Sequence, residues 1–274
     1  MVKLKGLDDV VGVTVVDPVF VKTRPDDDED KHHGWAFNES DGKFVGGAKT
    51  VREFYENISD SVNKFTVPIL YDKVRNEIVN NESTEILRMF GQEMNSLATR
   101  NKDWDPFPDT LKEQIESVNE WIYPMINNGV YRAGFAQSQE AYDVAVKDVF
   151  DGLEKVEEVL SKQRYISSPT QITEADIRLF VTLVRFDEVY HGHFKCNKKY
   201  IRDYNHITNY IRELYQITGV DETVNMHHIK HHYHRSHPTI NKFGIVPVGA
   251  NTVEDFSTPH NRGELFPLKQ LCLV

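Results

Sequence analysis

The chain has 274 residues, which is enough for one large domain or two ordinary ones. Its 39% hydrophobic and 27% charged residues are the proportions of a soluble globular protein. A formal net charge of -10 would repel phosphate backbones and argues against a nucleic-acid partner. No apolar run approaches the roughly 20 residues that span a bilayer, so no membrane partner is expected.

The two cysteines, Cys196 and Cys272, are too few for a disulfide scaffold and are typical of a reducing compartment. The first residues, MVKLKGLDDVVGV, lack the organisation of a signal peptide, because a charged head leads directly into an amphipathic segment. Together these features predict a cytoplasmic protein.

The N-terminal third predicts a compact α/β domain over residues 1–101. Its β-branched run at 10–16 (VVGVTVV) predicts a buried strand, and the acidic run at 26–30 predicts a solvated loop. Residues 50–58 have the apolar spacing of a short helix. Two short strands are predicted at 65–72 and 76–80, and Glu82 and Ser83 open the next helix.

The strands at 65–72 and 76–80 and the helix after them are the first candidate for a binding site. Pro68 cannot donate to a ladder, so either its run is a sheet edge or a cis bond turns the backbone of Val67 outward to a ligand. The helix that begins at Ser83 offers free N–H groups, which suit a carboxylate. An ordinary β-hairpin followed by a capped helix is the alternative, and both stay open on these residues.

The remainder predicts an all-helical domain over residues 102–249 and an extended tail at 250–274. Residues 101–109 (NKDWDPFPD) contain few helix formers and predict a linker between the domains. Apolar spacing predicts helices at 110–126, 137–162, 173–190, 204–217 and 223–233. Thr173 and Asp176 match a capping box at the start of the central helix, so Asp176 is interpreted as a buried cap, not a catalytic acid.

Other reactive side chains give weaker signals. His227/His231 and His228/His232 have the i, i+4 spacing that could chelate zinc, but no HExxH pattern or third ligand accompanies them, and no metal is expected. Neighbouring lysines could lower the pKa of Cys196, although a lone cysteine is usually a small buried residue. No GxSxG, GxGxxG or GxxxxGK(S/T) motif is present.

A series of segments in order across residues 3–249 resembles the glutathionyl-hydroquinone reductases, the Xi or omega-like glutathione transferases. The segments are KLKGL, VPILYD, NNES, NNGVY, ITEADIRLF and HFKCNKK. The resemblance implies a thioredoxin-like glutathione-binding domain followed by a helical transferase domain, in a homodimer. It also implies glutathione as co-substrate and glutathionyl-hydroquinones as substrates.

In that family a cysteine of a Cys-Pro-Trp-Ala motif attacks the sulfur of the conjugate. This gives a mixed disulfide with glutathione and a free hydroquinone, and a second glutathione then releases the enzyme. By resemblance, the glutathione site comprises Trp35, Val67, Pro68, Glu82 and Ser83. Tyr131 matches the family's proton donor, and Tyr190 and Tyr233 match tyrosines that steady the thiolate.

The chain departs from the family at its start. KLKGL lies at the end of the family's first helix, so this chain is expected to begin after the first strand and the Cys-Pro-Trp-Ala motif, with an incomplete thioredoxin-like domain. The reductase step then has no attacking thiolate. Two alternatives stay open: an N-terminally incomplete sequence of an active enzyme, or a non-catalytic protein that binds glutathione or hydroquinones.

Overall fold

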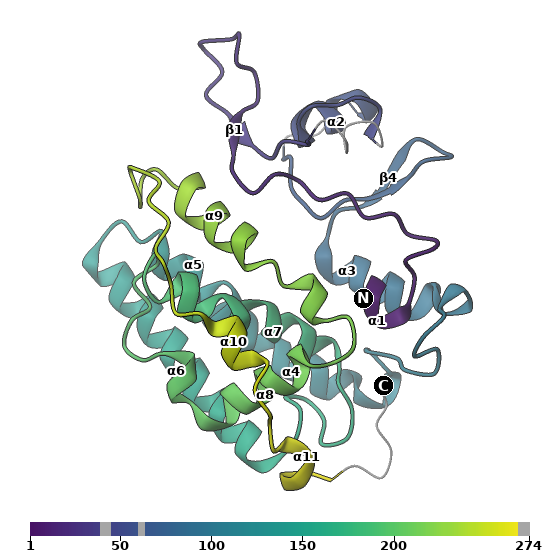
Figure 1. The fold of residues 1–274 in the computed structure, drawn as a ribbon, viewed down its shortest axis with the longest axis vertical. Coiled ribbons are helices and arrows are strands. Elements are labelled where there is room, and N and C mark those ends of the chain that lie inside the picture. The colour runs from purple at the N-terminus through teal and green to yellow at the C-terminus, as the bar shows by residue number, and fades with distance from the viewer. Residues whose placement is uncertain (39–44, 60–63, 268–274) are drawn as a thin grey trace.

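A computed structural model describes residues 1–38, 45–59 and 64–267, in two parts that lie one above the other (Figure 1). The upper part holds β1, α2 and β4, and the larger lower part is helical. Helix α9 (Met226–Ser236) runs along the side of the helical part that faces the upper one.

The N-terminal part contains short helices and two separate two-stranded antiparallel ladders, β1 with β2 and β3 with β4. Its elements are α1 (Val2–Lys5), β1 (Val21–Lys22), β2 (His33–Gly34), α2 (Val51–Ile58), β3 (Leu70–Asp72), β4 (Glu77–Asn80), α3 (Ser83–Arg88), η2 (Met89–Glu93) and η3 (Asn95–Leu97). The helix predicted at 50–58 is confirmed: the Thr50 hydroxyl caps it by accepting from the Glu53 amide.

The buried strand predicted at 10–16 is wrong. Val10, Val13 and Val15 are 52%, 68% and 53% exposed, and neither ladder of the described residues includes this run. β-branched residues favour extended backbone, but a strand also needs a neighbour that pairs with its backbone groups and covers its side chains. A local pattern cannot supply that neighbour.

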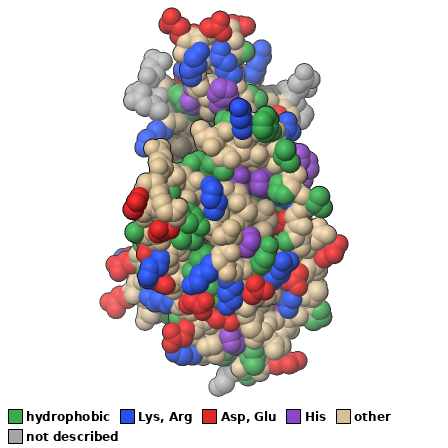
Figure 2. Space-filling model, turned by 90° about the vertical axis from the view of Figure 1, so that its left-hand side faces the viewer, with side chains coloured by type: hydrophobic (Ala, Val, Ile, Leu, Met, Phe, Trp, Pro, Cys, Tyr) green, Lys and Arg blue, Asp and Glu red, His purple; other side chains and the backbone are tan. Residues whose placement is uncertain are grey.

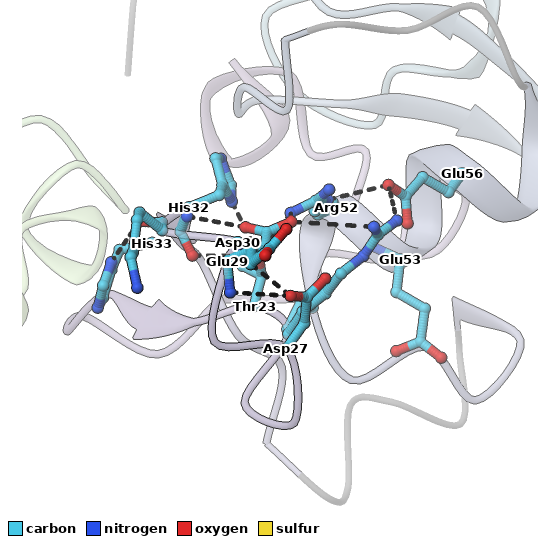
Figure 3. A network of polar contacts seen from close by, with 12 residues as sticks. Thr23, Asp27, Glu29, Asp30, His32, His33, Arg52, Glu53 and Glu56 are labelled. Carbon is cyan, nitrogen blue, oxygen red and sulfur yellow. Dashed lines mark hydrogen bonds and ion pairs between the residues drawn. The ribbon is translucent and has the colours of Figure 1, made fainter.

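The acidic run at 26–30 is a loop, as predicted, but part of it is fastened to α2 (Figure 3). Asp30 accepts from the His32 amide at 2.8 Å and pairs with Arg52 at 2.6 Å. Arg52 also pairs with Glu56 one helical turn on, at 2.9 Å. The Arg52 guanidinium therefore joins this loop to the helix, and the hydrogen bonds and charge around Asp30 lower the pKa of its carboxyl.

The helical part contains every helix that the apolar spacing predicts, with shifted ends, and further helices that it does not predict. Its main elements are α4 (Lys112–Ile122), η5 (Tyr123–Asn127), α5 (Gly129–Gly134), α6 (Gln139–Lys162), α7 (Glu174–Arg185), η6 (Phe186–Tyr190), α8 (Asn205–Tyr215) and α9. Short 3-10 turns are η4 (Asp109–Leu111), η7 (Ile201–Asp203) and η8 (Asp221–Thr223). Helix α5 lies between the first two predicted helices, where the apolar spacing predicts none.

The central helix α7 begins with the predicted capping box. Asp176 is fully buried and accepts from the Thr173 amide at 2.8 Å. It also accepts from the Ile166 amide at 2.9 Å and the Tyr210 hydroxyl at 2.7 Å. All its nearby contacts are therefore structural, which confirms the interpretation as a buried cap.

The extended tail predicted at 250–274 is wrong over its described residues. Helices α10 (Thr252–Phe256) and α11 (Arg262–Leu265) run down the helical part (Figure 1). Arg262 is completely buried and donates to the carbonyls of Leu160, Gln163 and Arg164. This anchor is a contact across about 100 residues, so the local composition of the segment gave no sign of it.

Buried polar contacts join the two parts. Arg88 of α3 binds the fully buried Glu174 of α7 through two nitrogens, at 2.5 and 3.1 Å. Lys5 donates to the carbonyls of Asn101 and Trp104, and the Trp104 indole donates to Ile172 at 2.9 Å. The segment predicted as a linker is therefore held to both parts.

Candidate functional site

Four of the five predicted glutathione-site residues lie close together. The Val67–Pro68 peptide bond is cis and precedes β3, while Glu82 and Ser83 are exposed at the start of α3. Asn81 connects the two segments by donating to Thr66 Oγ1 at 3.3 Å. Of the two backbone arrangements weighed for Pro68, the structure has the cis bond, and Val67 is 37% exposed beside it.

Tyr55 of α2 forms hydrogen bonds with both of these segments. Its hydroxyl donates to the Thr66 carbonyl at 2.9 Å and accepts from the Asn81 amide group at 3.1 Å. One buried tyrosine thus holds the chain before the cis proline next to the chain before α3. We call Val67, Pro68, Glu82 and Ser83 the α3 wall.

Trp35, the fifth residue, contacts the helical part. Its ring stacks on His232 of α9 with centroids 4.3 Å apart, and the Phe20 ring meets it edge-on at 4.7 Å. The Trp35 carbonyl accepts from the Val51 amide at the start of α2. Trp35 is therefore positioned from both parts of the molecule.

The three predicted tyrosines come together from three elements. Tyr233 of α9 is the centre: its hydroxyl is hydrogen-bonded to Tyr131 of α5 and, at 2.9 Å, to Tyr190 at the end of η6. Tyr190 and Tyr233 are buried, whereas Tyr131 is 37% exposed. Among the three, Tyr131 is therefore the ring that a ligand in solvent can reach.

Burial controls the ionisation of this cluster. Loss of solvent raises the pKa of Tyr190 and of Tyr233. The Tyr233 and Tyr131 hydroxyls raise the pKa of Tyr190 further, while Tyr131 raises and the hydrogen bond with Tyr190 lowers the pKa of Tyr233. The Arg185 charge opposes the rise for both. Both hydroxyls are consequently protonated at neutral pH. Tyr233 can orient the Tyr131 oxygen by a direct hydrogen bond, and Tyr190 contributes through its hydrogen bond to Tyr233.

Sequence reasoning missed the apolar side of the cluster. Phe194 stacks on Tyr190 with centroids 5.5 Å apart and contacts the edges of Tyr131 and Phe135 at 5.4 and 5.3 Å. Phe194 lies in the HFKCNKK segment, in which the sequence analysis singled out Cys196 alone as a reactive side chain. The partly exposed Phe135 next to Tyr131 gives the site a flat aromatic surface.

The histidines of α9 lie in different surroundings. His227 stacks on His231 at 3.9 Å, while His237 shares a 3.1 Å hydrogen bond with His193. Burial lowers the pKa of His193 to about 3 and that of His232 to about 4. Within residues 1–38, 45–59 and 64–267, no three His, Cys, Asp or Glu side chains are grouped to hold a metal ion.

Cys196 is buried away from any reactive position. It is fully covered, and burial raises its pKa to about 12 although the Lys195 charge pulls the other way. The suggestion that neighbouring lysines activate it is therefore wrong. Cys272 lies outside the described residues.

A surface cavity of about 740 Å³ lies beside the cluster, between η6, α9 and the chain at 240–250. His193 and His234 line it, but none of the three tyrosines does. Glu188 also lines the cavity, and its carboxylate accepts hydrogen bonds from the Ala250 and Thr252 amides. The cavity is therefore separate from the place where the three tyrosine hydroxyls meet.

Comparison with known proteins gives the family. A model of the glutathione S-transferase C-terminal domain matches residues 139–213. Glutathionyl-hydroquinone reductase YqjG of Escherichia coli (strain K12) is 43% identical over 271 residues, which are 97% of this chain and 78% of that protein. The PcpF reductase of Sphingobium chlorophenolicum is 38% identical over 90% of this chain and 76% of its own. This chain belongs to the glutathionyl-hydroquinone reductases.

Solved structures of this reductase family have the same fold. The glutathione-bound structure of YqjG superposes with a TM-score of 0.87 at 43% identity, covering 95% of this chain and 82% of the other. A Xi-class transferase from Natrialba magadii gives 0.87 at 42% identity, covering 96% and 77%. The predicted class, a thioredoxin-like part followed by a helical transferase domain, is confirmed, and the family is one of enzymes.

Proposed function

We propose that this protein binds glutathione along Trp35 and the α3 wall, and a glutathionyl-hydroquinone against the tyrosine cluster. The observation that carries this proposal is that the Tyr131 and Tyr190 hydroxyls both bind the hydroxyl of Tyr233. Tyr233 directly follows His232, which stacks on Trp35. The partly exposed Tyr131 and Phe135 suit an aromatic diol, because they pair a hydroxyl with an apolar ring face. Ser83 and Glu82 would take the γ-glutamyl end of glutathione.

The reaction that we propose for a chain with a thiolate in place is a thiol-dependent reduction. The thiolate attacks the glutathionyl sulfur, the bond from sulfur to the ring carbon breaks, and Tyr131 delivers a proton to that carbon. The products are the hydroquinone and a protein–glutathione disulfide. A second glutathione attacks this disulfide, leaves as oxidised glutathione and restores the thiolate. Tyr190 and Tyr233 keep the Tyr131 hydroxyl oriented throughout.

We further propose that the 274-residue chain binds these ligands without performing the thiol step. Cys196, the one cysteine among the described residues, is fully buried and has a raised pKa. A thiol in that state is a poor nucleophile. This observation favours the second candidate function, a non-catalytic protein that binds glutathione or hydroquinones.

Titration calorimetry with reduced glutathione tests the binding site. Ser83→Ala removes a hydroxyl at the start of α3, and we expect at least a fivefold weaker affinity. The matched control is Ser117→Ala on the exposed face of α4, which should leave the affinity unchanged. Equal affinities of the two variants would place glutathione elsewhere.

An activity assay separates the two candidate functions. The purified 274-residue chain is given a glutathionyl-hydroquinone with excess glutathione, and free hydroquinone is measured by chromatography. We expect binding of the conjugate without turnover. Turnover that survives Cys196→Ala and is lost in Tyr131→Phe would overturn the non-catalytic proposal and support the enzyme.

Three further assignments are proposals based on the family. We propose a homodimer, domains at residues 1–101 and 102–249, and a cytoplasmic location. The exposed Phe243, Ile245 and Val248 provide apolar surface that a second copy could cover. None of the described helices is long and apolar enough to cross a membrane. Light scattering of the calorimetry samples gives the oligomeric state.

A further inference from the structure

His232 is the point where α9 meets the N-terminal part. Its ring lies nearly parallel to Trp35, at an interplanar angle of 25°, and meets Phe20 edge-on with centroids 5.0 Å apart. Its Nδ1 atom is 2.9 Å from the carbonyl oxygen of Pro18. Because a carbonyl oxygen only accepts, Nδ1 carries the hydrogen in this contact.

A second hydrogen bond fastens the same segment one turn further along α9. The Phe20 amide donates to Ser236 Oγ at 3.0 Å. Residues 18–20 and Trp35 thus touch α9 at two positions four residues apart, which lie on one face of a helix. These contacts are made by backbone groups, aromatic rings and a hydroxyl, and no ion pair joins the described residues of this face to residues 18–20 or Trp35.

Tyr233, the residue after His232, points into the helical part. The His232 and Tyr233 rings are 5.2 Å apart, and the Tyr233 hydroxyl holds Tyr131 and Tyr190. One turn of α9 therefore carries the contact to Trp35 on one side and the centre of the tyrosine cluster on the other. A shift of His232 would move Trp35 relative to Tyr131.

We propose that His232 is a positioning residue: by its stack on Trp35 and its hydrogen bond to Pro18 it holds the N-terminal segment in register with the tyrosine cluster. This inference rests on the proposed function only where it concerns glutathione. His232 touches neither of the reacting groups, and it acts through Trp35. Burial keeps its ring neutral near pH 7, while the charges of His237 and Arg185 disfavour its protonation further.

Substitutions separate the two contacts of the ring. His232→Phe keeps an aromatic stack and removes the hydrogen bond to Pro18. His232→Asn keeps a donor near the position of Nδ1 and removes the stack. His232→Ala removes both. The control is His227→Ala, an exposed residue on the same helix whose ring contacts are with His228 and His231.

Hydrogen exchange of the full chain at neutral pH gives a readout that is independent of ligand. We expect the Phe20 amide to exchange at least tenfold faster in His232→Ala, with intermediate rates in His232→Phe and His232→Asn, while amides of α6 keep their protection. His227→Ala should match the unmodified chain. Unchanged exchange at Phe20, or equal acceleration in α6, would overturn the proposal.

A double-mutant cycle on glutathione affinity tests the route through Trp35. We expect His232→Ala to weaken binding about tenfold in the unmodified chain and less than twofold in a Trp35→Ala background. The same factor in both backgrounds would show that His232 does not act through Trp35. If the unmodified chain fails to bind glutathione, the proposed function fails, and the exchange of Phe20 still decides whether His232 positions the segment.

Discussion

The two parts of this molecule are stabilised in different ways. The helical part has a continuous core in which Val149, Leu153, Leu179 and Ile211 are completely buried. The N-terminal part has a small separate cluster of Leu7, Ile86, Phe90 and Ala98, and its ladders have two strands each. A helix makes its backbone hydrogen bonds locally, whereas a strand depends on a partner from elsewhere in the chain. The N-terminal part therefore relies more on contacts with its neighbour.

Breaking the ion pair between Arg88 and Glu174, which joins the two parts, should give the largest loss of stability. Arg88→Ala removes two hydrogen bonds from Glu174, whose side chain is completely buried, and leaves it with Arg178 at 3.4 Å and Asn119 at 3.2 Å. We expect a loss of about 3 kcal/mol in the free energy of unfolding, because a buried carboxylate loses its main partner. Urea titration followed by circular dichroism measures it.

A substitution of the other partner of this ion pair, Glu174, provides a second test. Glu174→Gln leaves Arg88, which is 36% exposed and also lies over the Phe107 ring, so water can solvate its charge. We expect this variant to lose less than Arg88→Ala. Arg75→Ala, at an exposed ion pair of the N-terminal part, should change stability by less than about 0.5 kcal/mol. Equal losses for Arg88→Ala and Arg75→Ala would contradict the assigned importance of this ion pair.

The difference between the parts also explains what the sequence could predict. The spacing of apolar residues predicted α6, α7 and α8, and the capping box located the start of α7 within a residue. The run at 10–16 failed because its burial is decided by a partner strand that no local pattern contains. The docking of α11 was missed for the same reason, since Arg262 anchors it by carbonyls about 100 residues earlier.

The candidate site was partly predictable. The resemblance selected Tyr131, Tyr190 and Tyr233, which the structure joins by hydrogen bonds. The residues that support them, Phe194 and His232, carry no motif of their own. Their positions follow from how α9 packs between the two parts, which is visible only in three dimensions.

The tyrosine cluster supplies the second test of the comparison, with an intermediate effect. Tyr233→Phe removes the hydroxyl that is hydrogen-bonded to both Tyr131 and Tyr190. The buried Tyr190 hydroxyl thereby loses its hydrogen bond to Tyr233. We expect a loss of about 1–2 kcal/mol in the free energy of unfolding. Tyr190→Phe, which removes the buried group itself, should cost less. Urea titration ranks the two, and the opposite order would contradict a central role for Tyr233.

The smallest effect is expected in the run that sequence alone places in a buried strand. Val13 is 68% exposed, so Val13→Thr should change the free energy of unfolding by less than about 0.5 kcal/mol. The same substitution at Val149, which is completely buried in α6, places a hydroxyl in the apolar core and should cost about 1–3 kcal/mol. Urea titration of both variants compares the two parts with one chemical change. A loss at Val13 as large as that at Val149 would show that residues 10–16 are covered in solution.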